Sequence, residues 1–212
     1  GIATMQGGHI DWADGFGHLA AGGNEPCGPD TIFMVASCSK PVTAMLVLQQ
    51  VERGVIDLDT DVNRYLRRWQ VPANEFTAEQ PVTLRHCLSH TAGLTVNGWG
   101  AFPNDGTPVP TTLDLPTGTQ PSPQQPVVVD KAYDGTSRYS GGGYVISQLV
   151  LEDTLGRPFA DLAEEMLFSP LGMTRSTFSH PLPPRFRNDV AGGHGDDGRT
   201  HPGGWMVSAE AG

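Results

Sequence analysis

The chain has 212 residues, 38% of them hydrophobic, and a formal net charge of −10 at pH 7. This length allows one sizeable core or two small ones, and no apolar stretch approaches the length of a membrane span. The acidic balance argues against nucleic acid or an anionic membrane surface as a partner.

Three cysteines, Cys27, Cys38 and Cys87, are present without C-x-x-C spacing. This pattern predicts neither a disulfide framework nor a zinc site. We expect Cys38 to be a small buried apolar side chain. The first residues lack a signal-peptide pattern, but a mature secreted protein would read the same, so the compartment is open.

Residues 1–20 predict a β-hairpin. Residues 2–5 and 9–16 are strand-like, and Gly7 and Gly8 between them form a turn dipeptide. Residues 21–30 are expected to be a loop.

The stretch 31–54, TIFMVASCSKPVTAMLVLQQVERG, predicts a short apolar run followed by a helix. Residues 42–51 are rich in helix-favouring Ala, Leu, Met and Gln, and Gly54 lies where a terminating glycine is expected. Pro41 is tolerated only in a first helical turn, so the helix is expected to begin near Ser37.

Ser37 and Lys40 would project from the same side of this first turn, because residues three apart share a helix face. A serine hydroxyl becomes a useful nucleophile when a desolvated amine nearby can accept its proton. The spacing therefore suggests a Ser–Lys nucleophile. An S-x-x-K match also arises by chance about once in a chain of this size, and Ser39 offers another hydroxyl, so the hypothesis needs partners elsewhere.

The next segments supply caps and short helices. The acidic residues 57–61 lack the pattern of a calcium loop and are expected to form a turn that caps a helical stretch at 62–66. Thr83 is expected to cap the helix LRHCLSH, which Gly93 ends. His86 and His90 have metal-ligand spacing, but no Glu follows the first His as in a zinc hydrolase helix, so no metal is predicted.

Residues 97–129 hold seven prolines and show hardly any helical or strand period. Such a long segment is typical of a functional loop or lid, or of disorder. Trp99 and Phe102 either line an acyl or aryl pocket or pin the loop to the core, and the sequence does not separate these interpretations.

After this loop, Tyr139 and Ser140 precede three glycines at 141–143. A helix is predicted at 144–155 with Gly156 as its stop. No phosphate-loop pattern is present, so we expect the glycines to permit close approach of a neighbouring element. Pro158 is expected to start a further helix through residue 168, and the chain from residue 178 onward is rich in proline and glycine.

Four motifs occur in one chain: S-x-x-K at 37–40, HCLSHTAGL at 86–94, RYSGGGY around Tyr139, and SPLGM at 169–173, with GVIDLD after the first helix. In this combination the chain resembles the serine β-lactamase-related superfamily over residues 1–177. The nearest groups are class C β-lactamases, D-alanyl-D-alanine carboxypeptidases and esterases of the same fold. The resemblance implies an α+β, β-lactamase/transpeptidase-like fold with an antiparallel sheet flanked by helices and a mainly helical lobe.

The resemblance also implies a division of the chain. Residues 1–36 would be the N-terminal strands of the α/β lobe, 37–180 the helical lobe with the nucleophile helix and the loop 97–129, and 181–212 a segment leading to a missing C-terminal part. The family's K-T-G or H-T-G strand is not found. We therefore expect an incomplete sheet, in a fragment, an incomplete chain, or one half of a cleaved protein that a second chain or C-terminal fragment completes.

By position in the family motifs, Ser37 would be the acylated nucleophile, with Lys40 and Tyr139 as the proton-transfer groups. The oxyanion would be held by the Ser37 backbone N–H and by one from a sheet strand. The resemblance implies a serine hydrolase that acts on an ester, amide or β-lactam carbonyl of a small-molecule substrate, without a cofactor. The family suggests a periplasmic or secreted protein, and a cytoplasmic one stays open.

One departure from the family affects the substrate. The asparagine of its Y-x-N motif is replaced by Gly141, which favours an ester as the substrate. Gly141, Trp99 and Phe102 are the candidate substrate contacts. Two alternatives stay open: a penicillin-recognising sensor or inactive homologue without turnover, and an acyltransferase.

Overall fold

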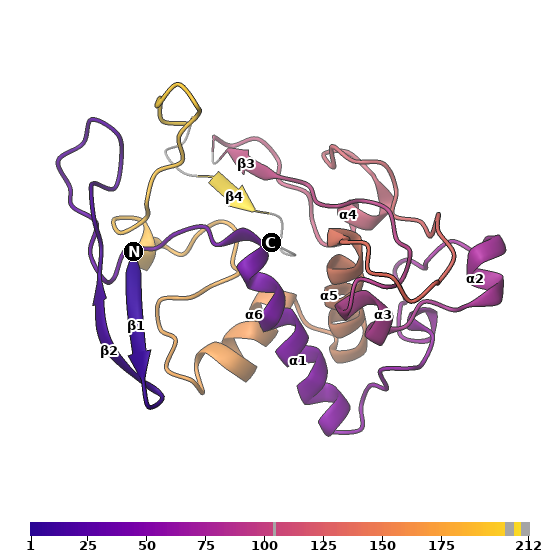
Figure 1. The fold of residues 1–212 in the computed structure, drawn as a ribbon. Coiled ribbons are helices and arrows are strands. Elements are labelled where there is room, and N and C mark those ends of the chain that lie inside the picture. Colours follow the sequence, from indigo (N-terminus) through magenta and orange to yellow (C-terminus); the bar gives the residue numbers. More distant parts are fainter. Residues whose placement is uncertain (104, 202–205, 209–212) are drawn as a thin grey trace.

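A computed structural model describes residues 1–103, 105–201 and 206–208. Figure 1 shows a β-hairpin at one end of the molecule and a group of helices at the other, with α1 and α6 between them. Helices and antiparallel strands are both present, so the predicted α+β class is confirmed.

The predicted N-terminal hairpin is confirmed. Strand β1 (Ile2–Gln6) pairs antiparallel with β2 (His9–Asp14). Gly7 and Gly8 make the turn with φ of +59° and +81°, a region that glycine enters without steric cost. Large apolar side chains are exposed on the hairpin: Ile2, Met5, Ile10 and Trp12. The hairpin therefore adds little to the core.

The helix predicted to begin near Ser37 begins slightly later than predicted. A 3₁₀ turn, η1 (Ala36–Ser39), contains Ser37 and leads directly into α1 (Lys40–Glu52). Pro41 lies in the first turn of α1, where its missing N–H costs no helical hydrogen bond. Gly54 follows the helix with φ of +70°, as expected of a terminating glycine.

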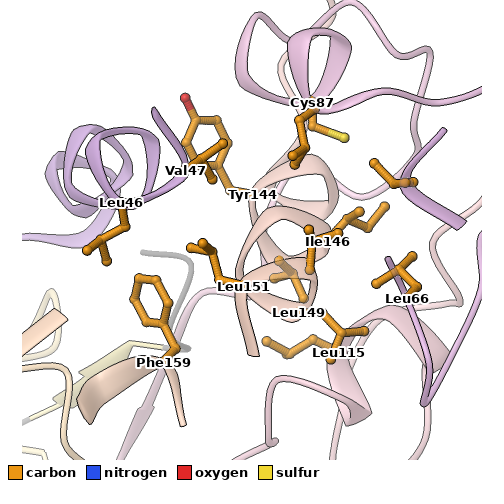
Figure 2. Packing of buried hydrophobic residues seen from close by; sticks show 14 of the residues in the cluster. Leu46, Val47, Leu66, Cys87, Leu115, Tyr144, Ile146, Leu149, Leu151 and Phe159 are labelled. Carbon is orange, nitrogen blue, oxygen red and sulfur yellow. The ribbon is translucent and has the colours of Figure 1, made fainter. Parts of the chain in front are cut away.

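Helix α5 (Gly141–Leu155) crosses the centre of the core and is buried along almost its whole length. Figure 2 shows side chains of α1, Leu46 and Val47, on one side of α5 and Leu66 on the other. Gln148 of α5 donates a hydrogen bond to the Thr43 hydroxyl of α1 at 3.2 Å, and both side chains are buried. This bond and the apolar packing fix α5 against α1.

The start of α5 corrects a prediction, because the helix begins at Gly141 rather than at residue 144. The Ser140 hydroxyl caps it by accepting the Gly143 N–H at 3.4 Å. Glycine disfavours helix, which is why the sequence pattern missed this first turn. The expected close approach is confirmed, because a Cβ added to Gly143 would lie only 3.1 Å from the Cys87 carbonyl oxygen.

Three short helical elements follow α1: η2 (Val62–Arg64), α2 (Glu75–Glu79) and α3 (Leu84–Leu88). Asp61 accepts a backbone N–H of η2 at 2.9 Å, and Thr83 accepts one of α3 at 3.3 Å. Both predicted caps are therefore confirmed.

The segment 97–129 is largely irregular. No helix or strand was predicted there, but the structure contains short elements of both kinds. Strand β3 (Ala101–Pro103) pairs antiparallel with β4 (Met206–Ser208), and α4 (Asp114–Thr117) is a single helical turn. Elements of three or four residues are too short to show a period in the sequence, which explains the error.

The predicted helix after Pro158 is confirmed as α6 (Phe159–Ala163), continued by η3 (Glu164–Phe168), a short π-helix. A last 3₁₀ turn, η4 (Pro184–Phe186), lies in the proline-rich region.

Candidate active site

Three polar groups from distant parts of the chain meet at the start of α1. Ser37 Oγ lies 2.7 Å from Tyr139 Oη, and Lys40 Nζ donates a hydrogen bond to Ser37 Oγ at 3.1 Å. Ser37 is exposed and Tyr139 is 44% exposed, whereas Lys40 is only 6% exposed. A hydroxyl open to solvent thus faces a shielded amine on one side and a phenol on the other.

The packing of α1 and α5 brings these groups together. Ser37 and Lys40 belong to η1 and the first turn of α1, and Tyr139 directly precedes the N-cap of α5. That N-cap, Ser140, also donates its hydroxyl to the Thr95 carbonyl at 2.8 Å. The residue that follows Tyr139 is therefore fixed by hydrogen bonds to both α5 and the segment at Thr95.

The surroundings of Tyr139 favour loss of its proton. Burial raises the pKa of the phenol, but hydrogen bonds with Ser37 and Lys40 and the charge of Lys40 outweigh it, so the pKa lies below its ordinary value. Lys40 Nζ also lies 5.3 Å from the Tyr139 ring centroid and 5.5 Å from that of Tyr144. Once ionised, a phenol held this way can accept a proton from a neighbouring hydroxyl.

Strained backbone surrounds the cluster. Among the described residues, the non-glycine residues with positive φ are Ala36 (+43°), His90 (+59°) and Val96 (+62°). Ala36 directly precedes Ser37, His90 contacts Tyr139, and the Val96 carbonyl accepts a bond from the N-cap side chain of α5. Each such conformation costs about 1–3 kcal/mol and persists only where its surroundings impose it.

His90, to which the sequence motifs assign no site role, lies against Tyr139. The two ring centroids are 4.4 Å apart, with the planes at 32°. His86, four residues earlier, lies instead against Tyr133, with centroids 4.8 Å apart. The two histidines thus face different tyrosines, and within the described ranges no group of three or more His, Cys, Asp or Glu side chains could hold a metal ion.

The three predicted substrate contacts lie in the hydrophobic core or against it. Trp99 is buried in the hydrophobic core, and Phe102 packs partly buried against that core. The buried Gly141 donates its N–H to the Asn97 carbonyl at 2.9 Å. These positions accord with the loop-pinning interpretation, and substrate contact by these residues stays a prediction.

Cys38 is exposed, so the prediction that it is buried was wrong. The 3₁₀ turn η1 presents Cys38 beside Ser37, whereas the general preference of free cysteine for buried positions had suggested burial. Cys38 and Ser39 line a cavity of about 730 Å³. Its wall also includes Phe33, Val42, Pro110, Phe168 and Phe178. The cavity therefore begins at residues adjoining the candidate nucleophile.

Cys38 is expected to react with iodoacetamide at least about tenfold faster than Cys87 in the native protein. Cys87 is 1% exposed, and burial raises the pKa of its thiol to about 12. Mass mapping of alkylated peptides before and after unfolding in urea measures both sites. Labelling of native Cys87 as fast as Cys38 would contradict the described burial, and Cys38→Ser serves as the control.

None of the helices among the described residues is long and apolar enough to cross a bilayer.

The fold is that of a serine β-lactamase-related protein. The Beta-lactamase family model matches residues 1–212, so the chain belongs to this family, as the motifs predicted.

Two relatives and one solved structure illustrate the similarity. Penicillin-binding protein 4* of Bacillus subtilis (strain 168) is 26% identical over 182 residues, covering 82% of this chain and 37% of the relative. Esterase EstB of Burkholderia gladioli is 31% identical over 182 residues, covering 82% of this chain and 45% of the relative. The chain thus spans less than half the length of these relatives.

The D-amino acid amidase from Ochrobactrum anthropi SV3, solved with D-phenylalanine, superposes with a TM-score of 0.70 at 22% identity. The match covers 92% of this chain and 56% of the amidase chain. This likeness confirms the predicted β-lactamase/transpeptidase-like fold.

Proposed function

We propose that this chain carries the nucleophile of a serine hydrolase, with Ser37 acylated and Lys40 and Tyr139 moving protons. The observation that carries the proposal is the pair of contacts at Ser37 Oγ, 2.7 Å to the phenol and 3.1 Å to the buried amine. The similarity to proteins named as an esterase and an amidase supports the reaction class.

In the proposed reaction Tyr139 reacts as its phenolate, which the charge of Lys40 stabilises. Ser37 Oγ adds to the substrate carbonyl carbon while its proton passes to the phenolate oxygen, and the negative charge moves to the carbonyl oxygen of the tetrahedral intermediate. The tetrahedral intermediate collapses, and the leaving alcohol takes the proton from Tyr139. Water then adds to the acyl-serine, again giving a proton to Tyr139. Collapse releases the carboxylic acid and returns the proton to Ser37.

The surroundings of Gly141 support an ester as the substrate. Gly141 replaces the asparagine of the family motif, and an added Cβ there would lie 2.8 Å from the Asn97 carbonyl oxygen. This backbone leaves no room for an amide side chain, so a substrate would have to be held without it. An activated or small ester requires less positioning than a β-lactam or amide.

The test incubates the full-length protein with p-nitrophenyl acetate, a chromogenic cephalosporin and a fluorescent penicillin, beside Ser37→Ala. Ester turnover that disappears in Ser37→Ala is the expected result. Ser39→Ala is the matched control and should keep its turnover, because the Ser39 side chain makes no capping bond at the start of α1.

Other outcomes separate the alternatives. Stable penicillin labelling of Ser37 without turnover indicates a sensor, and transfer of the acetyl group to an added alcohol indicates an acyltransferase. Wild-type turnover in Ser37→Ala would show that the mechanism is wrong.

A further inference from the structure

We propose that His90 is a positioning residue for Tyr139, holding the backbone on both sides of the phenol so that its oxygen stays beside Ser37. The inference rests on the proposed function and adds to it a residue outside the Ser37, Lys40 and Tyr139 cluster.

His90 forms a bond to each residue that flanks Tyr139. Its backbone carbonyl accepts the Arg138 N–H at 2.7 Å, and its Nδ1 accepts the Ser140 N–H at 3.1 Å. The imidazole also lies against the phenol, with the ring centroids 4.4 Å apart. One residue thus contacts three consecutive residues of the other segment, and Tyr139 is the middle one.

His90 is itself held firmly enough to act as a support. Its backbone has φ of +59°, and its N–H donates to the Cys87 carbonyl at 3.3 Å. The imidazole also lies 5.3 Å from the ring of Tyr144, whose hydroxyl donates to the Leu88 carbonyl at 3.1 Å. A left-handed residue fixed on both sides is expected where a precise side-chain direction matters.

The hydrogen bond that the Nδ1 of His90 accepts from the Ser140 N–H depends on the protonation state of the imidazole. Because Nδ1 accepts the Ser140 N–H, the neutral ring carries its proton on Nε2, and a second proton on Nδ1 would remove the acceptor. The charged and titratable groups around His90 are the Lys40 ammonium, the phenols of Tyr139 and Tyr144, and Arg138, which pairs with Asp130.

Burial and the positive charge of Lys40 lower the pKa of His90, so the neutral form persists below its ordinary range. The hydrogen bond that His90 Nδ1 accepts is therefore intact at neutral pH, and it is lost as the pH falls through this lowered pKa. In a profile of activity against pH, the fall in activity on the acid side, called here the acid limb, should therefore arise in part from protonation of His90.

The test measures kcat and KM of the full-length protein for p-nitrophenyl acetate between about pH 4.5 and about pH 9, spanning the His range. His90→Ala is expected to lower kcat about 10- to 100-fold with KM nearly unchanged, because the phenol is misplaced. His90→Asn is expected to recover most of kcat and to lack the acid limb due to His90, because asparagine tolerates positive φ and offers an oxygen acceptor that does not titrate here.

His86→Ala is the matched control, because it removes the other histidine that lies against a tyrosine, away from Ser37. An equal loss in His86→Ala, or an unchanged acid limb in His90→Asn, would overturn the inference. If His90→Ala does not fold, the acid limb of His90→Asn alone decides. Wild-type turnover in Ser37→Ala would refute the proposed function itself. If Ser37→Ala loses turnover but both His90 variants keep wild-type kinetics, only the role of His90 is refuted.

Discussion

Replacing Tyr139 with phenylalanine is expected to lower kcat/KM for p-nitrophenyl acetate by about 10³-fold. The phenyl ring can still lie against His90, but the hydroxyl 2.7 Å from Ser37 Oγ is lost. Lys40→Met keeps a side chain of similar length and removes the amine 3.1 Å from Ser37, so we expect a loss of similar size. Steady-state kinetics of the full-length variants measures both effects.

The pH dependence sharpens this prediction. Because the pKa of Tyr139 lies below its ordinary value, the wild-type rate should rise with pH through that lowered pKa, and Tyr139→Phe should lack this rise. Tyr133→Phe is the matched control, since Tyr133 also lies against a histidine but away from Ser37. A Tyr139→Phe enzyme with nearly wild-type activity and the same alkaline rise would refute the assigned role.

Restoring the family asparagine at Gly141 is expected to destabilise the protein by about 3 kcal/mol rather than to create β-lactamase activity. The new Cβ would lie 2.8 Å from the Asn97 carbonyl oxygen and 3.3 Å from Trp99 Cζ3, so the loop at residues 97–99 would have to move. The amide would also enter a buried position. Thermal unfolding should show a Tm lower by roughly 6–12 °C for a protein of this size.

Gly98→Ala tests whether the effect is specific to position 141. Gly98 lies in the same loop, but its added Cβ meets no atom within 4 Å, so its Tm should hardly change. An unchanged Tm for Gly141→Asn, or new turnover of a chromogenic cephalosporin, would show that this backbone adapts more easily than described.

Much of the fold follows from local chemistry that the sequence displays. The Gly7–Gly8 turn, the caps at Asp61 and Thr83 and the terminating Gly54 each satisfy a local backbone requirement, and the structure places them as predicted. The division into residues 1–36, 37–180 and 181–212 stays a prediction.

The candidate site was only partly visible in the sequence. The S-x-x-K spacing predicts that Ser37 and Lys40 lie on the same side of the first helical turn, and the motif around Tyr139 indicates a third residue of the site. The role inferred for His90 depends on contacts between segments 50 residues apart, which no spacing rule reveals. The exposure of Cys38 depends on the 3₁₀ turn η1, whereas the prediction rested on the general preference of free cysteine for buried positions.

The separation of 102 residues between Ser37 and Tyr139 has a consequence for folding. A local S-x-x-K turn could form in an isolated helix, but the contact with the phenol requires closure of a long loop and docking of α1 on α5. The reactivity that we propose for Ser37 would therefore be a property of the assembled core. It should arise in the step that docks these helices and disappear with that docking when the chain unfolds, so that Ser37 labelling would report on tertiary assembly.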